Sequence, residues 1–310
     1  WVLTSDGIET GGAGLFATLE DNFRLMKLYM NGGVWNGERI LSEEYVKAAT
    51  SKQIDTQSES KVNPPAIDNF LGYGYQIWQC QPKGAYRADG AMGQFTIVIP
   101  DKNMEIAIME NASGAHWAQK TLDVLWEFLD KIPDVDRLEE NMEKVKHLQR
   151  RLRSLSLPAP EFRPEGKSGS NLYGRTIRFE SPLRMDIYGI LRHAADTVQE
   201  KLVSELRIEP VNPNALRIRV LEKGILETEI WAALDGTWKE NEVNEGVLNR
   251  LLASAYWESD TCLVVSLRWI ETCGLETLKI HVGEKNITAD LTGTLALHDD
   301  QTGVTGEFLD

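Results

Sequence analysis

A serine and a lysine three positions apart are the first residues in this sequence that could do covalent chemistry. Ser58 and Lys61 have the spacing that places both side chains on one face of a helix, where the lysine could activate the serine as a nucleophile. The surrounding segment, residues 57–65, is polar and ends in two prolines, a composition that predicts a loop. We therefore do not expect Ser58 to be a nucleophile.

Histidines and cysteines offer no convincing metal or redox pattern. The histidines contain no i, i+4 pair and no carboxylate at ligand spacing, so we expect no metal site and no cofactor. The cysteines are Cys80, Cys262 and Cys273, too few for a disulfide framework and without a Cys-x-x-Cys pair. Buried free thiols are the expected state, and a bridge between Cys262 and Cys273 across neighbouring strands is the alternative.

The composition is that of an ordinary globular chain with room for two cores. It has 310 residues, 42% of them hydrophobic and 26% charged, which excludes collagen-like, low-complexity and fully disordered classes. The net charge of -14 disfavours binding to nucleic acid. No run approaches the roughly 20 apolar residues of a membrane span. Because the sequence opens on Trp1 without an initiator Met, we expect it to start inside a longer polypeptide, and its localisation cannot be read.

The first 132 residues alternate helix and strand patterns. Thr18 can cap a helix with Asp21 three positions on, and apolar residues follow at helical spacing until Gly32. Two more helices are predicted, at about residues 42–49 and 116–131. Strand alternation covers residues 72–78, 94–100 and 104–109, and the polar stretch 51–69 is predicted to be a loop.

Residues 133–171 are predicted to connect two domains. Apolar residues step by three and four through the charged stretch 134–157, which predicts one amphipathic helix. Pro158 ends the pattern, and the segment that follows is rich in Pro, Gly and Ser, as is typical of linkers.

Residues 172–310 are predicted to form an all-β domain, either a barrel or a sandwich. Eight short runs rich in β-branched and aromatic residues are separated by turn residues at the spacing of an antiparallel structure. The recurring tryptophans are predicted to pack in the core or at strand rims, and a ligand cavity lined by them is the alternative. They are Trp231, Trp238, Trp257 and Trp269.

Three segments of the first domain carry a family resemblance. They are a Gly-rich stretch at 12–21 followed by Asn-Gly-Gly at 31–33 and Gly-Glu-Arg-Ile-Leu-Ser at 37–42, the Gly-Tyr-Gly-Tyr-Gln-Ile-Trp run at 72–78, and Ala-Asp-Gly-Ala-Met-Gly-Gln at 88–94. In this order they resemble the C-terminal part of the catalytic domain of the serine β-lactamase and penicillin-binding protein superfamily, in its class C-like branch. The resemblance implies an α+β fold in which helices pack on an antiparallel sheet, over residues 1–132.

The resemblance implies acyl transfer, in which a serine attacks an ester or amide carbonyl and water releases the acyl-enzyme. The family takes its nucleophile and base from a Ser-x-x-Lys helix start and a Tyr-x-Asn loop, both of which precede the matched region. We therefore expect no catalytic residue within the chain and an inactive fragment. Tyr29-Met30-Asn31 fits the second motif by letter, but it falls in the last turn of the first predicted helix, where packing explains the tyrosine better.

Four residues correspond to the family's third motif and the turn after it: Ala88, Asp89, Gly90 and Gly93. In the family, a Lys or His attracts a substrate carboxylate, and the motif's glycine lets the substrate backbone approach without a Cβ clash. Gly90 matches, whereas Ala88 and Asp89 depart from the pattern. We expect these residues to bind substrate, although Gly90 and Gly93 could instead be only the glycines of a strand bend.

The departures argue against penicillin-like substrates. A carboxylate at Asp89 would repel a substrate carboxylate, and Arg87 should point to the face opposite Ala88 because strand side chains alternate. The expected function is therefore hydrolysis of a neutral or cationic ester or amide. The alternatives are a non-catalytic protein that binds a small molecule, peptide or protein partner on a degenerate scaffold, and a lipocalin-like carrier in the β domain.

The predicted sheet of the first domain has only three strands, so part of it lacks a partner. An unpaired edge and an apolar face would be exposed. We expect a missing N-terminal segment, or a second copy through the bare edge, to pair with it.

Overall fold

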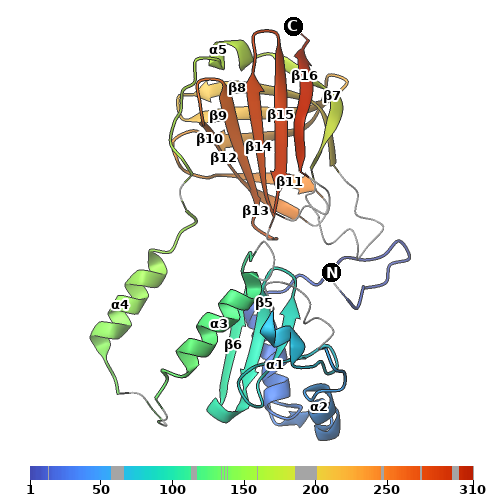
Figure 1. The fold of residues 1–310 in the computed structure, drawn as a ribbon, viewed down its shortest axis with the longest axis vertical. Helices are drawn as coiled ribbons and strands as arrows, with labels where there is room; N and C mark the ends of the chain where they lie inside the picture. The colour runs from blue at the N-terminus through green and yellow to red at the C-terminus, as the bar shows by residue number, and fades with distance from the viewer. Residues whose placement is uncertain are drawn as a thin grey trace. The chain divides into compact units, whose positions relative to one another are not determined.

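The computed structural model describes residues 1–12, 14–56, 66–112, 117–133, 135, 137, 139–158, 160–185, 201–245, 248–272, 274–294 and 300–309. They form two compact units (Figure 1). One comprises Phe16–Glu140, and the other comprises Trp1–Leu15 together with Asn141–Asp310.

The smaller unit is an antiparallel sheet with helices on both faces. Its strands are β3 (Trp78–Gln79), β4 (Tyr86–Gly90), β5 (Gln94–Ile99) and β6 (Met104–Ile108), in that spatial order. One face packs on α1 (Leu19–Met30) through a core that includes Met26 and Val98. The other face packs on α3 (Trp117–Leu129) through a core that includes Ile97 and Leu122. Alternate residues of β5 therefore belong to two different cores.

The helix predictions of this unit are confirmed. Thr18 caps α1, and Asp21 returns the bond in a complete capping box. Ser42 caps α2 (Glu43–Ala49) through the backbone N–H of Tyr45. A two-stranded ribbon of β1 (Val34–Trp35) and β2 (Glu38–Arg39) lies between the two helices in the sequence. Two 3-10 turns complete the unit, η2 (Ile67–Phe70) and η3 (Pro100–Lys102).

The predicted strand at 72–78 is wrong over most of its length. Only Trp78 lies in a strand, because Gln76 adopts a left-handed backbone conformation with φ +62° and breaks the extended run. The backbone N–H of Gly74 bonds the carbonyl of Ile77 at 2.7 Å, which closes a tight turn. The predicted loop at 51–69 is wrong at its end, where the 3-10 turn η2 begins at Ile67. Residues 57–65 of this predicted loop lie outside the described residues.

Glu105 of β6 gives this unit an expected dependence on pH. Its Oε1 is buried without a hydrogen-bond partner in the described structure, and burial raises its pKa from 4.5 to about 7, against the attraction of Lys27. The folded state therefore holds a proton that the unfolded chain releases near 4.5, so the cost of ionising Glu105 grows as pH rises from there to about 7.

We expect the melting temperature to fall between about pH 4.5 and pH 7, and the Glu105→Gln variant to lose part of that fall. Thermal unfolding of both proteins across this range measures it. An identical pH profile for the two proteins would contradict the assignment.

The larger unit is a β-barrel with a short helical segment at one end. Among the described residues its sheet has ten strands in the order β10-β9-β8-β7-β16-β15-β14-β13-β12-β11, and a further pairing of β10 with β12 closes it. The strands are β7 (Thr176–Met185), β8 (Lys201–Asn212), β9 (Ala215–Glu222), β10 (Ile225–Ala233), β11 (Lys239–Glu245), β12 (Leu248–Trp257), β13 (Cys262–Trp269), β14 (Leu275–Val282), β15 (Asn286–Gly293) and β16 (Gln301–Phe308). Of the two predicted architectures, the barrel is the one found, and the chain as a whole is α+β.

A side chain completes the barrel seam between β10 and β11. The side-chain oxygen of Asn241 accepts a hydrogen bond from the backbone N–H of Trp231 at 2.7 Å. The side-chain nitrogen of Asn241 donates one to the backbone carbonyl of Trp231 at 2.9 Å. This pair of bonds imitates the ladder that a neighbouring strand would supply. Asn241 is buried, and its amide oxygen receives its hydrogen bond from Trp231 across the seam, so opening the seam would cost that bond.

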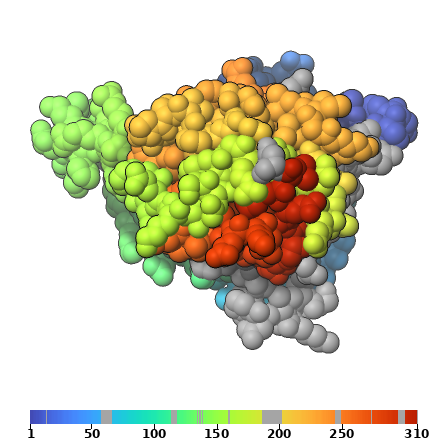
Figure 2. All heavy atoms as spheres, turned by 90° about the horizontal axis from the view of Figure 1, so that it is seen from above, coloured from blue at the N-terminus to red at the C-terminus, as the bar shows by residue number. Residues whose placement is uncertain are grey.

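The segment containing α5 (Gly169–Leu172) covers one end of the barrel, where its yellow-green atoms are visible in Figure 2. Leu172 belongs to the barrel core, and the indole N–H of Trp257 donates to the Tyr173 hydroxyl at 3.0 Å. A Cβ on Gly166 would lie 2.2 Å from the Trp257 ring, so only glycine fits there. Trp257 and Trp269 are core residues, as predicted, and Trp231 and Trp238 are half-buried.

The amphipathic helix is shorter than predicted. It is α4 (Met142–Arg153), capped by Asn141, and the first part of the predicted range includes residues outside the described structure. Cys80 and Cys262 are free buried thiols, as expected, and Cys273 lies outside the described residues. None of the helices in the described part of the chain is long and apolar enough to cross a membrane.

Candidate active site

The hairpin of β4 and β5 brings the four predicted site residues together. Ala88, Asp89 and Gly90 end β4, and Gly93 closes the turn that leads into β5. Gly90 lies opposite Gln94, and the Gly93 N–H bonds the Gly90 carbonyl at 3.2 Å. Their grouping follows directly from their closeness in the sequence, because a hairpin needs no distant partner.

One side of β4 is open along these residues. Strand β3 is so short that it pairs only with Tyr86 and Arg87. Backbone groups of an antiparallel strand point to its two neighbours alternately, so Asp89 is the next residue after Arg87 to face the β3 side. Within the described structure no strand pairs with Asp89 on that side. An extended substrate backbone could bond to Asp89 there.

The two faces of β4 differ sharply in character. Tyr86 and Ala88 lie on the face that packs against the α1 core. Arg87 and Asp89 lie on the opposite face, so the predicted opposition of Arg87 and Ala88 is confirmed. The guanidinium Nε of Arg87 donates to a carboxylate oxygen of Asp89 at 2.8 Å. The sequence predicts that the Asp89 carboxylate repels a substrate carboxylate. In the structure its negative charge is paired with Arg87 and is not free to do so.

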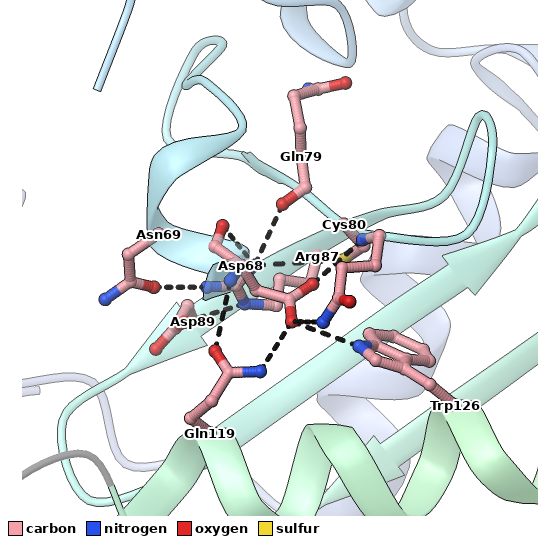
Figure 3. Close-up of polar contacts among 9 residues, drawn as sticks. Asp68, Asn69, Gln79, Cys80, Arg87, Asp89, Gln119 and Trp126 are labelled. Carbon is pink, nitrogen blue, oxygen red and sulfur yellow. Dashed lines mark hydrogen bonds and ion pairs between the residues drawn. The ribbon is translucent and has the colours of Figure 1, made fainter. Parts of the chain in front are cut away.

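Arg87 is completely buried and each end of its guanidinium is used (Figure 3). It donates to the side-chain oxygen of Asn69 at 2.7 Å and to the carbonyl of Gln79 at 3.0 Å. The rings of Trp78 and Phe95 lie 5.6 and 5.9 Å from its carbon Cζ, within cation–π distance. Burial raises the pKa of Asp89, and the adjacent Arg87 charge lowers it.

Asp68 forms the second centre of this buried network. It is 0% exposed and its two oxygens accept four hydrogen bonds. One oxygen accepts the backbone N–H of Gln81 at 2.9 Å. The other accepts the side-chain amides of Gln81 and Gln119, each at 2.7 Å, and the indole N–H of Trp126 at 3.0 Å. Asp68 thereby connects η2, the β3–β4 loop and α3 behind the open strand edge.

The turn that carries Gly93 is held in an unusual conformation. Met92 has φ +67°, which is uncommon for a residue with a side chain, and Gly93 has φ +88°. The segment after β6 clamps the turn, since the Gln94 amide donates to the Glu110 carbonyl at 2.6 Å and the Ala112 N–H to the Met92 carbonyl at 2.9 Å. Burial raises the pKa of the Glu110 carboxyl, which accepts a bond from Thr121.

The two glycines of the hairpin should respond differently to alanine. A Cβ on Gly93 would lie 2.1 Å from the Glu110 carboxylate on a backbone that alanine adopts only with strain. A Cβ on Gly90 would meet the Gln94 Cβ at 3.1 Å without that strain. We expect Gly93→Ala to destabilise the unit by about 2 kcal/mol and Gly90→Ala by less than about 1 kcal/mol. Urea unfolding of both variants measures the difference, and equal losses would contradict it.

The site also contains an aromatic pair, Tyr73 and Trp78, to which the sequence assigns no role there. The rings of Tyr73 and Trp78 lie 4.7 Å apart, and the Tyr73 hydroxyl donates to the Gln76 side chain at 2.9 Å. Burial, and then the charge of Asp89, raise the pKa of Tyr73, which places its hydroxyl in the electrostatic field of the strand edge. The run at 72–78 predicts a strand and carries part of the family resemblance, but neither assigns Tyr73 or Trp78 to the site; of the two, only Trp78 lies in a strand.

The structure describes only the second of the two literal catalytic motifs. Ser58 and Lys61 lie outside the described residues. Tyr29 packs against the α1 core, as predicted. In the part of the chain that the structure describes, no three His, Cys, Asp or Glu side chains are placed to hold a metal ion.

Comparisons with known proteins agree with this geometry. The Beta-lactamase family model matches residues 2–127, so this part of the chain is similar to that family. A comparison with curated proteins found no match.

Three of the matching solved structures are similar to this chain only at low identity and low TM-score. The octameric penicillin-binding protein homologue from Pyrococcus abyssi is 15% identical with a TM-score of 0.23, covering 86% of this chain and 43% of that one. Secretory abundant heat soluble protein 4 from Ramazzottius varieornatus is 11% identical with a TM-score of 0.29, covering 46% of this chain and 94% of that one. The fatty-acid-binding protein of Manduca sexta is 10% identical with a TM-score of 0.28, covering 44% and 97%.

Proposed function

We propose that the protein is a serine hydrolase that cleaves an ester or amide through an acyl-enzyme. The observation that carries the proposal is the open edge of β4, where Asp89 has backbone groups free of a strand partner among the described strands and Gly90 has no side chain. An extended substrate can add to such an edge through main-chain bonds, with its reacting carbonyl held beside the glycine.

The substrate is proposed to be neutral or cationic. Ala88 provides no cation where the family uses a Lys or His to attract a carboxylate, and the Arg87 charge is already used by Asp89. An anionic substrate would therefore find no unpaired positive charge at this point of the strand.

The chemistry divides between this chain and a nucleophile that we place in polypeptide outside the 310 residues. The serine oxygen attacks the carbonyl carbon, the alcohol or amine leaves with a proton, and water then cleaves the acyl-enzyme. The β4 edge holds the substrate in line with the attack, and the Arg87–Asp68 network behind it keeps the edge rigid.

Fluorophosphonate labelling of the complete native protein tests the proposal. We expect one covalent adduct on a serine, slowed at least tenfold by Gly90→Val, because a branched side chain would occupy the approach to the strand. The control is Glu227→Val at an exposed position of barrel strand β10, which should label at the normal rate. The absence of any serine adduct would overturn the hydrolase assignment.

A non-catalytic binding protein is the second candidate, and the missing cation at Ala88 favours it. It predicts no labelling but retained binding of a peptide or small ligand at the β4 edge. Loss of that binding in Gly90→Val, measured by calorimetry, would separate this candidate from an inactive scaffold without a site.

The outer edge of β6 supports a proposal about assembly. In the described structure β6 pairs only with β5, so its other edge lacks a strand. We propose that a further segment of the same protein, or a second copy, pairs there. Sedimentation of the 310 residues as a monomer with this edge exposed to hydrogen exchange would contradict it.

A further inference from the structure

A hollow lies on the barrel unit, beside the seam between β10 and β11. It has a volume of about 490 Å³ and is open to solvent. Two tryptophans, Trp231 and Trp238, line it together with the polar side chains of Asn214, Asp235 and Lys239. All of these residues belong to the barrel unit, so the hollow is independent of the β4 edge.

The two indole rings are fixed in place by their own hydrogen bonds. The indole N–H of Trp231 donates to the Glu229 carboxylate at 3.1 Å. The Asn241 side chain bonds both the backbone N–H and the backbone carbonyl of Trp231. The Trp238 N–H donates to the Pro158 carbonyl at 3.1 Å, and the Arg268 guanidinium lies 5.7 Å from its ring. With both N–H groups used by the protein, the rings offer apolar surface to a ligand and no donor.

The polar lining supplies donors and acceptors beside these rings. Within the described structure the β10–β11 turn uses only one oxygen of Asp235, which accepts both the N–H and the hydroxyl of Thr237. Its other oxygen can accept a ligand hydroxyl. Asn214 can both donate and accept, and Lys239 can donate. Asn214 and Lys239 are exposed.

We propose that this hollow binds a neutral oligosaccharide. A pyranose ring has apolar C–H faces, which can stack on the fixed indoles, and a rim of hydroxyls, which match the amide, carboxylate and ammonium groups. An apolar ligand such as a fatty acid requires an enclosed apolar pocket, and this hollow is open and largely polar. An anion would meet one lysine balanced by Asp235 on a chain of net charge -14.

Calorimetric titration of the 310-residue protein with cellotetraose and with chitotetraose tests the inference. We expect saturable binding of at least one sugar with a Kd no weaker than about 1 mM. Absence of binding by both at about ten times that concentration would overturn it.

Variants locate the site if a sugar binds. Trp238→Ala should weaken binding at least tenfold, and Asn214→Ala, whose exposed side chain makes no bond that the fold requires, should weaken it several-fold. Trp35→Ala, a half-buried tryptophan of the smaller unit, is the matched control and should bind normally. Unchanged affinity in Asn214→Ala and Trp238→Ala would place the sugar elsewhere and overturn the assignment. Because fluorophosphonate labelling reports on a different unit, this result and that one can fail independently.

Discussion

Replacing Arg87 by leucine is expected to unfold the smaller unit or leave it barely stable. Arg87 is the largest polar side chain with no exposure in this unit, and its removal leaves the Asp89 carboxylate, only 23% exposed, without its cation. Breaking a buried ion pair from one side costs about 3–5 kcal/mol, a large part of the stability of a domain. The Asn69 side chain and the Gln79 carbonyl lose their donor in the same change.

Urea unfolding followed by far-ultraviolet circular dichroism measures this loss. The matched control is Arg24→Leu, because Arg24 pairs with Asp21 at 3.4 Å with both side chains more than half exposed, where water and salt screen the charges. The control should lose far less stability. A loss for Arg87→Leu as small as that for Arg24→Leu would show that the buried pair does not hold the β4 edge.

A double variant separates the charge from the packing. In Arg87→Leu/Asp89→Leu the Asp89 carboxylate is removed together with its cation, and two apolar side chains occupy the same face of β4. We expect it to recover part of the stability lost in Arg87→Leu, which gives a coupling between the two residues of about 1 kcal/mol or more. If the second substitution instead adds its own loss, the pair interacts too weakly to account for the first.

The sequence predicts most of the elements of the smaller unit, because their signals are local. Thr18 and Asp21 mark the start of α1 within four residues, and alternation over Phe95–Ile99 marks β5 with one apolar set for each core. The candidate site is found for the same reason, since Ala88, Asp89, Gly90 and Gly93 lie on one hairpin.

The network behind the site could not be predicted from local patterns. The partners of Arg87 and Asp68 come from η2, from the β3–β4 loop and from α3, as many as 58 residues away in the sequence. The available signal was an arginine in a short strand, and alternation correctly gave the face on which it lies. What decides its role is the set of acceptors that the fold gathers there, and no spacing rule contains them.

Three barrel strands were also missed, for a different reason. β11, β15 and β16 are rich in Asn, Thr, Gly and Glu and carry few of the bulky residues that mark strands. In β15 the period-two signal is present but small, since Ile287, Ala289 and Leu291 are the inward side chains and the residues between them are polar. Pairing with a neighbouring strand on each side stabilises such a strand, and this contribution is tertiary.

Asp68→Asn is expected to be the second most damaging change in the smaller unit. Asparagine has the same shape as aspartate but replaces one acceptor oxygen with an NH₂ donor. At Asp68 every neighbour on both oxygens is a donor: the backbone and side chain of Gln81, the Gln119 amide and the Trp126 indole. Whichever way the amide turns, at least one buried donor faces another donor, so we expect a loss of about 3 kcal/mol.

The neighbouring Asp123→Asn is the control for that change, since Asp123 accepts one bond from the same Gln119 at 2.9 Å but lies on the exposed side of α3. Its amide can turn its oxygen to Gln119 and its NH₂ to water, so little stability should be lost. Urea unfolding and hydrogen exchange of the β4 amides distinguish the two variants. Unchanged urea unfolding and unchanged hydrogen exchange in Asp68→Asn would contradict this prediction. The Asp68 hydrogen bonds would then not be what fixes η2 and α3 behind the β4 edge, and the rigidity of the proposed substrate-binding edge would need another source.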